Sequence, residues 1–465
     1  MISKLAKYSI RIFAILLFIG ALYASDNRDE QRIQTCAGNP WYWQYKGEPV
    51  LLLGGTREDN LFQIPDVQEH LDLLQQVGGN YIRNTMSSRD EGNLQPFIQL
   101  NNGLYDLDLW NGEYWQRFEQ LLHLTAERDI IVQIEIWDKW DMSADRWPSS
   151  PWYPDMNVNY TFEDTKLKSH YGDFMLEAHD FFNSVPALHN DEVLLKYQQR
   201  FVDKLMSISL RYDNILYSID NELHPTFSGE WSLYWARRIQ RQAIKYGADI
   251  YITEMYWPPE LRAKDHRVVL NNPQLFSFFE ASQNTSNKTP WQHWRNLQWL
   301  RYALEDSPRP INIVKIYSKR DGAGRMWRQV IGGAATSRFH RPPGGLGLNA
   351  EARTHIKSLR MWLDEYDIFT GQPDGDPGYV AGHRLLEDRD WEEAYCNYRE
   401  DKQYSVYFPD GGEVKLKAAN GTWNVRWLDI EHSQWSESET MNAEKTIPLT
   451  RPQKGQWLAL VTRVK

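Results

Sequence analysis

An Asn–Glu pair at the end of an apolar run points most directly to chemistry in this sequence. Residues 215–220 have the character of a strand, and Asn221 and Glu222 follow them. Where parallel strands alternate with helices, the groups that act on a ligand stand at the carboxyl ends of the strands. Cleavage of a glycosidic bond needs an acid that protonates the leaving oxygen. We therefore predict Glu222 as a general acid/base and Asn221 as a hydrogen-bond partner of a sugar hydroxyl.

The same chemistry needs a second carboxylate, and two further glutamates are candidates. Glu280 lies near the end of the apolar run 275–282, and Glu254 lies near the end of the run 249–256. Either side chain could face the pocket that Glu222 enters. The alternative for each is a buried carboxylate with a structural role.

Two other predicted strands end in side chains that suit the binding of a sugar. Arg83 and Asn84 end the second predicted strand, and Trp137 and Asp138 end the third. We predict all four as substrate-binding residues. Arg83 would orient a catalytic carboxylate, or it would form a salt bridge inside the fold.

Basic and hydroxyl side chains end the last two predicted strands. Lys315 and Tyr317 end the seventh, and Arg338 and His340 end the eighth. An inward lysine is costly to desolvate without an anionic partner, so a neighbouring glutamate would account for Lys315. The four side chains are predicted to bind substrate. Lys315, Arg338, His340 and the following Arg341 would bind an anionic substituent of a sugar. The alternative is a set of salt bridges that hold the strands together.

The elements that must position these residues follow a regular order. Strand-like apolar runs alternate with helical periods from 40 to 366, which is typical of a parallel sheet covered by helices. Eight strand–helix units fit a (β/α)8 TIM barrel of the α/β class at 38–370. A turn-rich linker at 371–392 and short alternating strands at 393–465 predict a small all-β sandwich domain after the barrel. The predicted strands are 50–53, 80–86, 130–137, 215–222, 249–256, 275–282, 310–317 and 336–340, and the predicted helices are 65–77, 114–128, 191–211, 230–245, 291–304, 325–334 and 350–365.

Several segments resemble known glycosidases. The segments 47–56 and 80–83 resemble the apiosidase-like barrel family, and the Asn221–Glu222 pair resembles the signature of the large glycosidase clan that shares the barrel. The segment 404–460 resembles the collagen-binding-type β-domain that often follows such barrels. The resemblance implies retaining hydrolysis of a plant or algal polysaccharide, with carboxylates at the ends of strands four and seven.

The seventh strand departs from the pattern of that family. The resemblance implies a glutamate near Lys315, but no glutamate occurs between Asp306 and Leu348. Either this strand is assigned wrongly, or the partner carboxylate comes from another strand, or the usual retaining mechanism is absent.

The chain is acidic and rich in aromatic residues. Its net charge is −10, which argues against a nucleic acid as the main partner, because phosphate binding needs a basic surface. It contains 21 Trp and 25 Tyr. Trp137, Trp140, Trp147 and Trp152 lie beside polar residues, at or within a long predicted insertion at 139–190. Rings with an apolar face and a polar edge suit a partly wet surface, and we expect some of them to stack on a sugar.

The N-terminus predicts export. Basic residues precede an apolar run at 12–22 that is too short to cross a bilayer. We predict a signal peptide at 1–24, a secreted or periplasmic protein, and no membrane association after cleavage; a retained signal anchor is the alternative. Export permits disulfides, so we predict an intramolecular bridge between Cys36 and Cys396.

These features predict an exported glycoside hydrolase that acts on a plant or algal polysaccharide or its oligosaccharides. The sequence has no phosphate-binding glycine loop and no zinc-protease motif, and we expect neither a cofactor nor a metal. A polysaccharide lyase is the second hypothesis, in which Lys315, Tyr317 or His340 removes a proton beside a uronate. The third is a glycan-binding barrel without catalytic activity.

Overall fold

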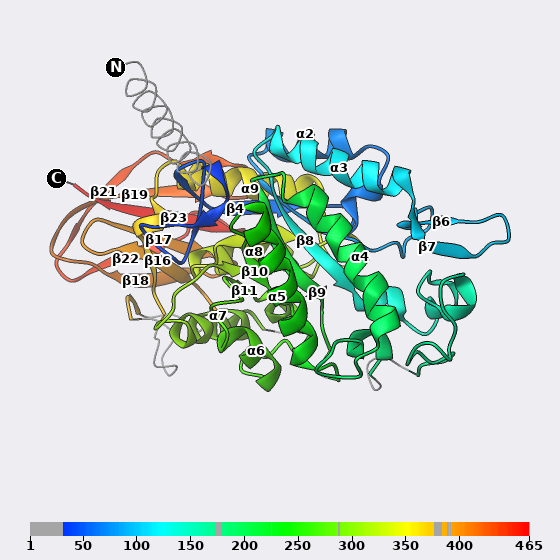
Figure 1. The fold of residues 1–465 in the computed structure, drawn as a ribbon. Coiled ribbons are helices and arrows are strands. Elements are labelled where there is room, and N and C mark those ends of the chain that lie inside the picture. The colour runs from blue at the N-terminus through cyan, green and yellow to red at the C-terminus, as the bar shows by residue number, and fades with distance from the viewer. Residues whose placement is uncertain are drawn as a thin grey trace, which may run out of the picture.

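The computed structural model describes residues 31–172, 178–224, 226–286, 289–375, 384–387, 390 and 392–464. The predicted signal peptide at 1–24 lies outside these residues. So do positions 376–383, 388–389 and 391 of the predicted linker. In Figure 1 the C-terminal strands, orange to red, lie at one end of the molecule, and the hairpin of β6 (Phe97–Gln99) and β7 (Tyr105–Trp110) lies at the other.

A six-stranded parallel sheet forms the centre of the larger part. Its order is β10-β9-β8-β5-β4-β13, and each neighbouring pair runs in parallel. All eight residues of β8 and all seven of β9 are buried, as expected for strands that are covered on both faces. The bounds are β4 (Leu52–Gly55), β5 (Tyr81–Thr85), β8 (Ile131–Asp138), β9 (Ile215–Asn221), β10 (Ile252–Thr253) and β13 (Thr336–Phe339).

Two more parallel strands, β11 (Phe279–Glu280) and β12 (Ile311–Asn312), pair with each other. Backbone hydrogen bonds join this pair to both edges of the sheet. On one side Ser277 N–H donates to the Ile252 carbonyl at 2.9 Å, and on the other Ala335 N–H donates to the Ile311 carbonyl at 2.8 Å. All eight strands therefore point their carboxyl ends the same way, and the loops after them share one face of the molecule.

Helices follow the strands, and their ends are fixed by local side chains. Asn111, Asp191, Ser228, Thr289 and Asn349 each accept a hydrogen bond from the first turn of the helix they precede, which satisfies an otherwise unpaired backbone N–H. Figure 1 shows α4 and α5 alongside β8 and β9. The helices are α2 (Val67–Gln76), α3 (Gly112–Ala126), α4 (Glu192–Ser209), α5 (Gly229–Tyr246), α6 (Arg267–Leu270), α7 (Pro290–Ala303), α8 (Gly322–Ile331) and α9 (Ala350–Leu363), and seven of them match the predicted ranges to within about three residues.

The insertion after β8 folds into short 3-10 turns rather than long elements. They are η2 (Lys139–Met142), η3 (Trp147–Ser149), η4 (Pro154–Met156) and η5 (Asp180–Asn183). Trp147 and Trp152, which were expected on a glycan-facing surface, are 1% and 6% exposed, because they pack in the core. Trp140, on η2, is half-buried. That expectation was therefore wrong for Trp147 and Trp152.

The C-terminal strands form two antiparallel sheets around a second core. One sheet has the order β14-β16-β17-β23-β19-β20, with β21 also paired to β19, and the other has the order β15-β18-β22. The bounds are β14 (Gln372–Pro373), β15 (Leu386–Glu387), β16 (Tyr395–Arg399), β17 (Gln403–Phe408), β18 (Glu413–Lys417), β19 (Gly421–Asp429), β20 (Gln434–Trp435), β21 (Glu439–Ala443), β22 (Thr446–Thr450) and β23 (Trp457–Arg463).

The larger of these sheets packs directly on helices α8 and α9. Trp362 Nε1 donates to Ser405 Oγ at 2.8 Å, and Asn397 Nδ2 donates to the Ile331 carbonyl at 2.8 Å. The rings of Trp327 and Tyr407 stack with centroids 5.6 Å apart. The two parts therefore share a continuous hydrophobic contact.

The predicted disulfide does not form. Cys36 and Cys396 are both buried free thiols. Cys36 packs in the core of the α/β part, beside the small sheet of β1 (Gln34–Thr35), β2 (Trp43–Tyr45) and β3 (Glu48–Val50). Cys396 points into the separate core between the C-terminal sheets. The prediction was wrong because it joined two residues that belong to different cores.

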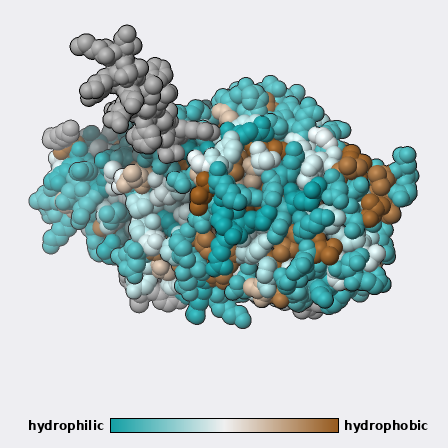
Figure 2. Space-filling view, viewed as in Figure 1, coloured by the Kyte–Doolittle hydropathy of each residue, from teal (hydrophilic) through white to brown (hydrophobic). Residues whose placement is uncertain are grey.

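The face in Figure 2 is mostly hydrophilic, with a hydrophobic area at the end where the β6–β7 hairpin lies. Ile98 and Leu109 of the hairpin are exposed, and so is Val158 beside it. Among the described residues, none of the helices has the length and apolar composition needed to cross a bilayer.

Candidate functional site

A polar cavity of about 380 Å³ lies at the carboxyl ends of the strands. Its walls come from the loops after β4, β5, β8, β9, β12 and β13. This is the face on which proteins of this architecture carry their active sites. The lining residues are Asp59, Arg89, Asp90, Trp140, Arg146, Asn221, Glu222, Lys315, Tyr317, His340 and Arg341.

Glu222 enters this cavity at the end of β9. Its backbone has φ 60°, in the left-handed region that a residue with a side chain seldom adopts. Such conformations occur preferentially at functional sites, where the surrounding structure maintains them. The side chain is 8% exposed, so the carboxylate is almost wholly enclosed by protein.

Four donors from three other strand ends hold the Glu222 carboxylate. Oε1 accepts from Lys315 Nζ at 2.7 Å, from the Tyr317 hydroxyl at 2.6 Å and from Gln283 Nε2 at 2.8 Å. Oε2 accepts from Trp140 Nε1 at 3.2 Å. The donors follow β12, β11 and β8, so the carboxylate is fixed by several independent elements.

These contacts keep Glu222 ionised. Burial opposes ionisation, but the charges of Lys315 and Lys139 and the hydrogen bonds from Lys315 and Tyr317 outweigh it, and the pKa of Glu222 lies well below its usual range. Burial lowers the pKa of Lys315 in turn, and Glu222 opposes that shift. The lysine predicted to need an anionic partner has one, and it also hydrogen-bonds Asn221 Oδ1.

Asp59 is the second deeply placed carboxylate of the cavity. Its Oδ2 lies 2.8 Å from Arg89 Nη2 and 3.0 Å from Arg341 Nε, and its Oδ1 pairs with Arg83. Although burial raises its pKa, these cations and His340 hold the pKa of Asp59 well below its usual value.

His340 lies against Asp59 and Tyr317. Its Nδ1 is 3.6 Å from Asp59 Oδ1, and its ring lies 4.7 Å from the Tyr317 ring. Burial lowers the pKa of His340 to about 3 despite the opposing effect of Asp59. The imidazole is therefore neutral at physiological pH.

Three predicted substrate-binding residues lie beneath the cavity and do not line it. Arg83 is fully buried and bonds Glu135 through Nε at 2.6 Å and Nη2 at 2.5 Å, so it forms the internal salt bridge that was the alternative reading. Arg338 donates to Thr56 Oγ1 and to the Val314 carbonyl.

Asn84 is the third of these residues. It accepts a hydrogen bond from Phe62 N–H at 3.1 Å and is fully buried. Its side chain therefore stabilises the loop before α2.

Neither of the glutamates predicted as the second catalytic carboxylate lines the cavity. Glu280 is 1% exposed and is held by Gln133 Nε2 at 3.0 Å and Ser282 N–H at 2.9 Å. Burial raises its pKa to about 7. Glu254 accepts from Asp220 N–H at 3.1 Å, and burial raises its pKa to about 8. Both are buried carboxyl groups in the interior, which agrees with the alternative of a buried, structural carboxyl group.

Trp137 and Asp138 lie beside the cavity rather than in it. Asp138 pairs with Arg89, and its Oδ1 accepts from Trp140 N–H at 3.0 Å, which caps η2. Trp137 packs 5.2 Å from the ring of Phe201. Both residues line a smaller second cavity that adjoins the first.

Arg89, Asp90 and Arg146 are among the lining residues that the sequence reasoning missed. They stand in loops beyond the strand ends, where no periodic pattern marks them. The signal that existed was a polar run, Ser87 to Asp90, directly after a buried strand.

Solved structures with a similar fold are glycoside hydrolases. A glycoside hydrolase family 5 structure from Bacteroides vulgatus ATCC 8482 matches with a TM-score of 0.61 and 12% identity over 94% of each chain. Another structure, named as a glycoside hydrolase, matches with a TM-score of 0.61 and 12% identity over 94% of this chain and 98% of its own. A family 5 mannosidase of Rhizomucor miehei matches with a TM-score of 0.50 and 11% identity over 72% of this chain and 98% of its own.

At this identity the likeness establishes a shared fold and nothing about the reaction. It extends over 94% of this chain for the first two structures, so it includes C-terminal strands. No protein-family model and no curated protein matches the sequence.

Proposed function

We propose that the chain is an exported glycoside hydrolase, built as a closed (β/α)8 barrel with a C-terminal β-sandwich, in which Glu222 is the reacting carboxylate. The backbone hydrogen bonds at both edges of the parallel sheet support the closed barrel. The glycoside hydrolases of similar fold support the class of substrate. Removal of a signal peptide at 1–24 would leave the described part of the chain intact.

The placement of Glu222 carries this proposal. It is an ionised carboxylate at the end of the fourth strand, in the open polar cavity, with donors from Lys315, Tyr317, Gln283 and Trp140. A purely structural carboxylate would not need a left-handed backbone at a cavity wall. Trp140 also offers a half-buried indole face on which a sugar ring can stack.

The charge state of Glu222 favours a nucleophile or a base over an acid. A general acid must hold a proton near neutral pH, and the pairing with Lys315 works against that state. Asp59 is the other deep carboxylate in the cavity, and we assign it the stabilisation of positive charge that develops on the sugar. This assignment replaces Glu254 and Glu280, because those side chains face the interior. Because the carboxylates of Glu222 and Asp59 are both ionised, the leaving oxygen takes its proton from a water molecule in the cavity.

The apiosidase-like subtype and a plant or algal polysaccharide substrate belong to the same proposal. They rest on the sequence segments 47–56, 80–83 and 404–460. The mixed charges of the cavity suit a polar glycan, in which several hydroxyl groups form hydrogen bonds at once.

The test is a screen of wild-type protein and two variants against xylan, mannan, glucan and pectin oligosaccharides. We expect new reducing ends with the wild type on at least one glycan. Glu222→Gln should lower kcat by about 10³-fold or more on that glycan, because the ionised oxygen is lost. Glu260→Gln is the matched control, since Glu260 is exposed on the loop after β10 and does not line the cavity. Equal activity of the two variants would contradict the proposal.

A glycan-binding protein without hydrolytic activity is the second candidate. Lys315 stands where the clan resemblance implies a nucleophile, and the other deep carboxylate, Asp59, is saturated by arginines. This candidate predicts that glycan binds to wild type and to Glu222→Gln alike, with no product. An ultraviolet-absorbing unsaturated product would instead identify a lyase.

A further inference from the structure

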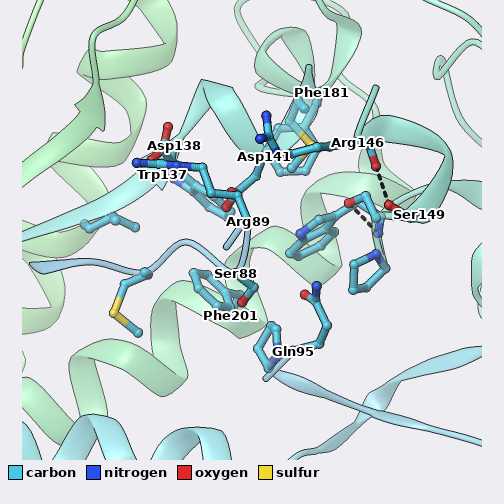
Figure 3. A pocket seen from close by; sticks show the side chains of 17 residues that line it. Ser88, Arg89, Gln95, Trp137, Asp138, Asp141, Arg146, Ser149, Phe181 and Phe201 are labelled. Carbon is cyan, nitrogen blue, oxygen red and sulfur yellow. Dashed lines mark hydrogen bonds and ion pairs between the residues drawn. The ribbon is translucent and has the colours of Figure 1, made fainter. Parts of the chain in front are cut away.

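A second, smaller cavity of about 130 Å³ adjoins the Glu222 cavity. Arg89 and Arg146 line both, so the two spaces meet at these side chains. Figure 3 shows the labelled side chains around the smaller cavity, with Phe181 and Arg146 on one side of it and Phe201 and Gln95 on the opposite side. We call this space the side cavity. The proposed reaction at Glu222 makes no use of it.

Aromatic side chains line the side cavity on two sides (Figure 3). Trp137 lies with its ring centroid 5.2 Å from Phe201 and 5.5 Å from Phe181, and Trp152 lies 5.3 Å from Phe181. All four side chains are buried. A methyl or methylene group that binds against these rings would be transferred from water to an apolar surface, which is favourable.

The rest of the lining is polar, and most of its groups are already bonded within the protein. Asp138 pairs with Arg89, and Asp141 accepts from Ser87 Oγ at 2.5 Å. Ser88 Oγ donates to the Leu94 carbonyl at 2.7 Å. Few acceptor oxygens of the lining are therefore left for a hydrogen-bond donor of a ligand.

Two hydrogen-bond donors at the side cavity remain available. Trp137 is 5% exposed, and its indole Nε1 has no acceptor among the described residues. Arg146 Nη1 donates to Ser143 Oγ at 3.1 Å and lies 3.6 Å from the exposed Asp145, whereas its Nη2 group forms no hydrogen bond with a described residue. A buried indole N–H without a partner is costly, so the side cavity favours a ligand with an acceptor oxygen.

Size and charge narrow the chemistry of that ligand. A dry cavity of about 150 Å³ holds a benzene molecule, so the side cavity has room for a group of a few heavy atoms. Its lining carries two arginines and two aspartates, so the formal charges of these four side chains cancel. A net anion would therefore find no excess positive charge there.

We propose that the side cavity binds an acetyl substituent of the glycan whose backbone occupies the Glu222 cavity. The methyl group packs on Trp137, Phe181 and Phe201, and the carbonyl oxygen accepts from Trp137 Nε1 and Arg146. The shared chemistry is a methyl group and a carbonyl oxygen, and either an N-acetyl or an O-acetyl group supplies it. The inference rests on the proposed function for the position of the sugar, and it goes beyond that function by naming a substituent.

The test measures binding separately from hydrolysis. Dissociation constants are determined by calorimetry for N-acetylglucosamine, 6-O-acetylglucose and glucose, on wild type, Ser88→Leu and Ser88→Thr. Ser88 lines the side cavity and not the Glu222 cavity, so leucine there fills the space. Threonine is the matched control, because it keeps the hydroxyl group and adds one methyl.

Wild type should bind at least one acetylated sugar about tenfold or more tightly than glucose, from one buried methyl group and one hydrogen bond. The ratio should fall to about one in Ser88→Leu and persist in Ser88→Thr. Preference for only the first or only the second sugar identifies an N-acetyl or O-acetyl source. No preference in wild type, or an equal preference in Ser88→Leu, would overturn the inference.

Failure of the proposed function would look different. Glu222→Gln leaves the side cavity unchanged, so it should retain the acetyl preference whether or not wild type cleaves a glycan. Preference without cleavage counts against the hydrolase alone, and cleavage without preference counts against the acetyl site alone.

Discussion

Glu222 carries its charge because a lysine stands opposite it. Lys315 Nζ lies 2.7 Å from Glu222 Oε1, and both side chains are nearly inaccessible, at 2% and 8% exposed. Breaking a buried pair by removing one partner leaves an uncompensated charge, which costs more than the pair itself contributes. The state of the cavity therefore depends on both residues together.

The first prediction concerns Lys315→Met. Without the ammonium group, burial should raise the pKa of Glu222, and the acid limb of the kcat/KM profile should move up by at least about one pH unit. Stability should fall by about 3 kcal/mol at neutral pH. Lys319→Met, on the exposed loop that follows, is the control. A profile that matches wild type would show that Lys315 does not set the charge of Glu222.

The second prediction concerns Glu280→Gln. The folded pKa of Glu280, about 7, lies above its unfolded value of 4.5, so the folded state binds the extra proton. Stability from this group is therefore present below about pH 4.5 and is lost as the pH rises through about 7, by on the order of 3 kcal/mol. Urea unfolding at pH 5 and pH 8 should show this loss in wild type and in Glu260→Gln. In Glu280→Gln the loss of unfolding free energy between pH 5 and pH 8 should be smaller by about 3 kcal/mol.

The residues that could be predicted are those that follow directly from strand ends. Asn221, Glu222, Lys315, Tyr317 and His340 all line the predicted cavity. Arg83, Arg338 and Glu280 lie at strand ends too, but their side chains lie below the cavity, in the interior of the sheet. The sequence of a short strand does not show which of its side chains reach the cavity and which stay below it.

Single elements control the geometry that the residues need. The turn η2 places Trp140 beside Glu222, and Asp138 caps that turn through Trp140 N–H at 3.0 Å. Asp138 also pairs with Arg89, so it links the turn to the loop after β5.

The third prediction separates these two roles of Asp138. Asp138→Ala removes the cap and the ion pair, and it should lower stability by at least about 1 kcal/mol and raise KM as Trp140 loses its position. Asp138→Asn keeps an acceptor for the cap and should raise KM less. Because the chain has 21 Trp, a change in tryptophan fluorescence on glycan binding would be assigned to Trp140 by its loss in Trp140→Phe. Equal effects of the two substitutions would mean that the cap does not position this indole.

The long elements were predictable and the loops between them were not. The caps, apolar faces and lengths of helices such as α4 and α5 depend on residues that are close together in the sequence. The insertion after β8 has no periodicity, and its path depends on aromatic packing around Trp137 and Phe181. For that reason Arg146, which it contributes to both cavities, could not be found in advance.

At the scale of the whole molecule, the C-terminal sheets are part of one hydrophobic structure. Their larger sheet covers α8 and α9 through Tyr407, Ser405 and Asn397. The turn-rich linker at 371–392 predicted a barrel followed by a small β-sandwich domain. The contact between them arises from residues far apart in the chain, which local patterns do not reveal.

The fourth prediction is that the α/β part does not survive alone. Deleting 393–465 would expose Trp327, Trp362 and Tyr366, each of which buries roughly 150–250 Å². At about 25 cal/mol per Å² that loss is on the order of 10 kcal/mol, comparable with the whole stability of a domain. The truncated protein should aggregate or bind a hydrophobic dye, whereas Trp362→Phe, which loses one hydrogen bond, should lower stability by about 1 kcal/mol. A truncated protein with the wild-type Tm would refute this dependence.

A crystal structure of Glu222→Gln with a bound oligosaccharide from the screen tests the central claim most directly. The account predicts electron density for sugar in the cavity of Glu222, with the side-chain amide of residue 222 within about 3.5 Å of an anomeric carbon or a glycosidic oxygen. Sugar bound elsewhere on the molecule, with this cavity filled by water, would contradict it.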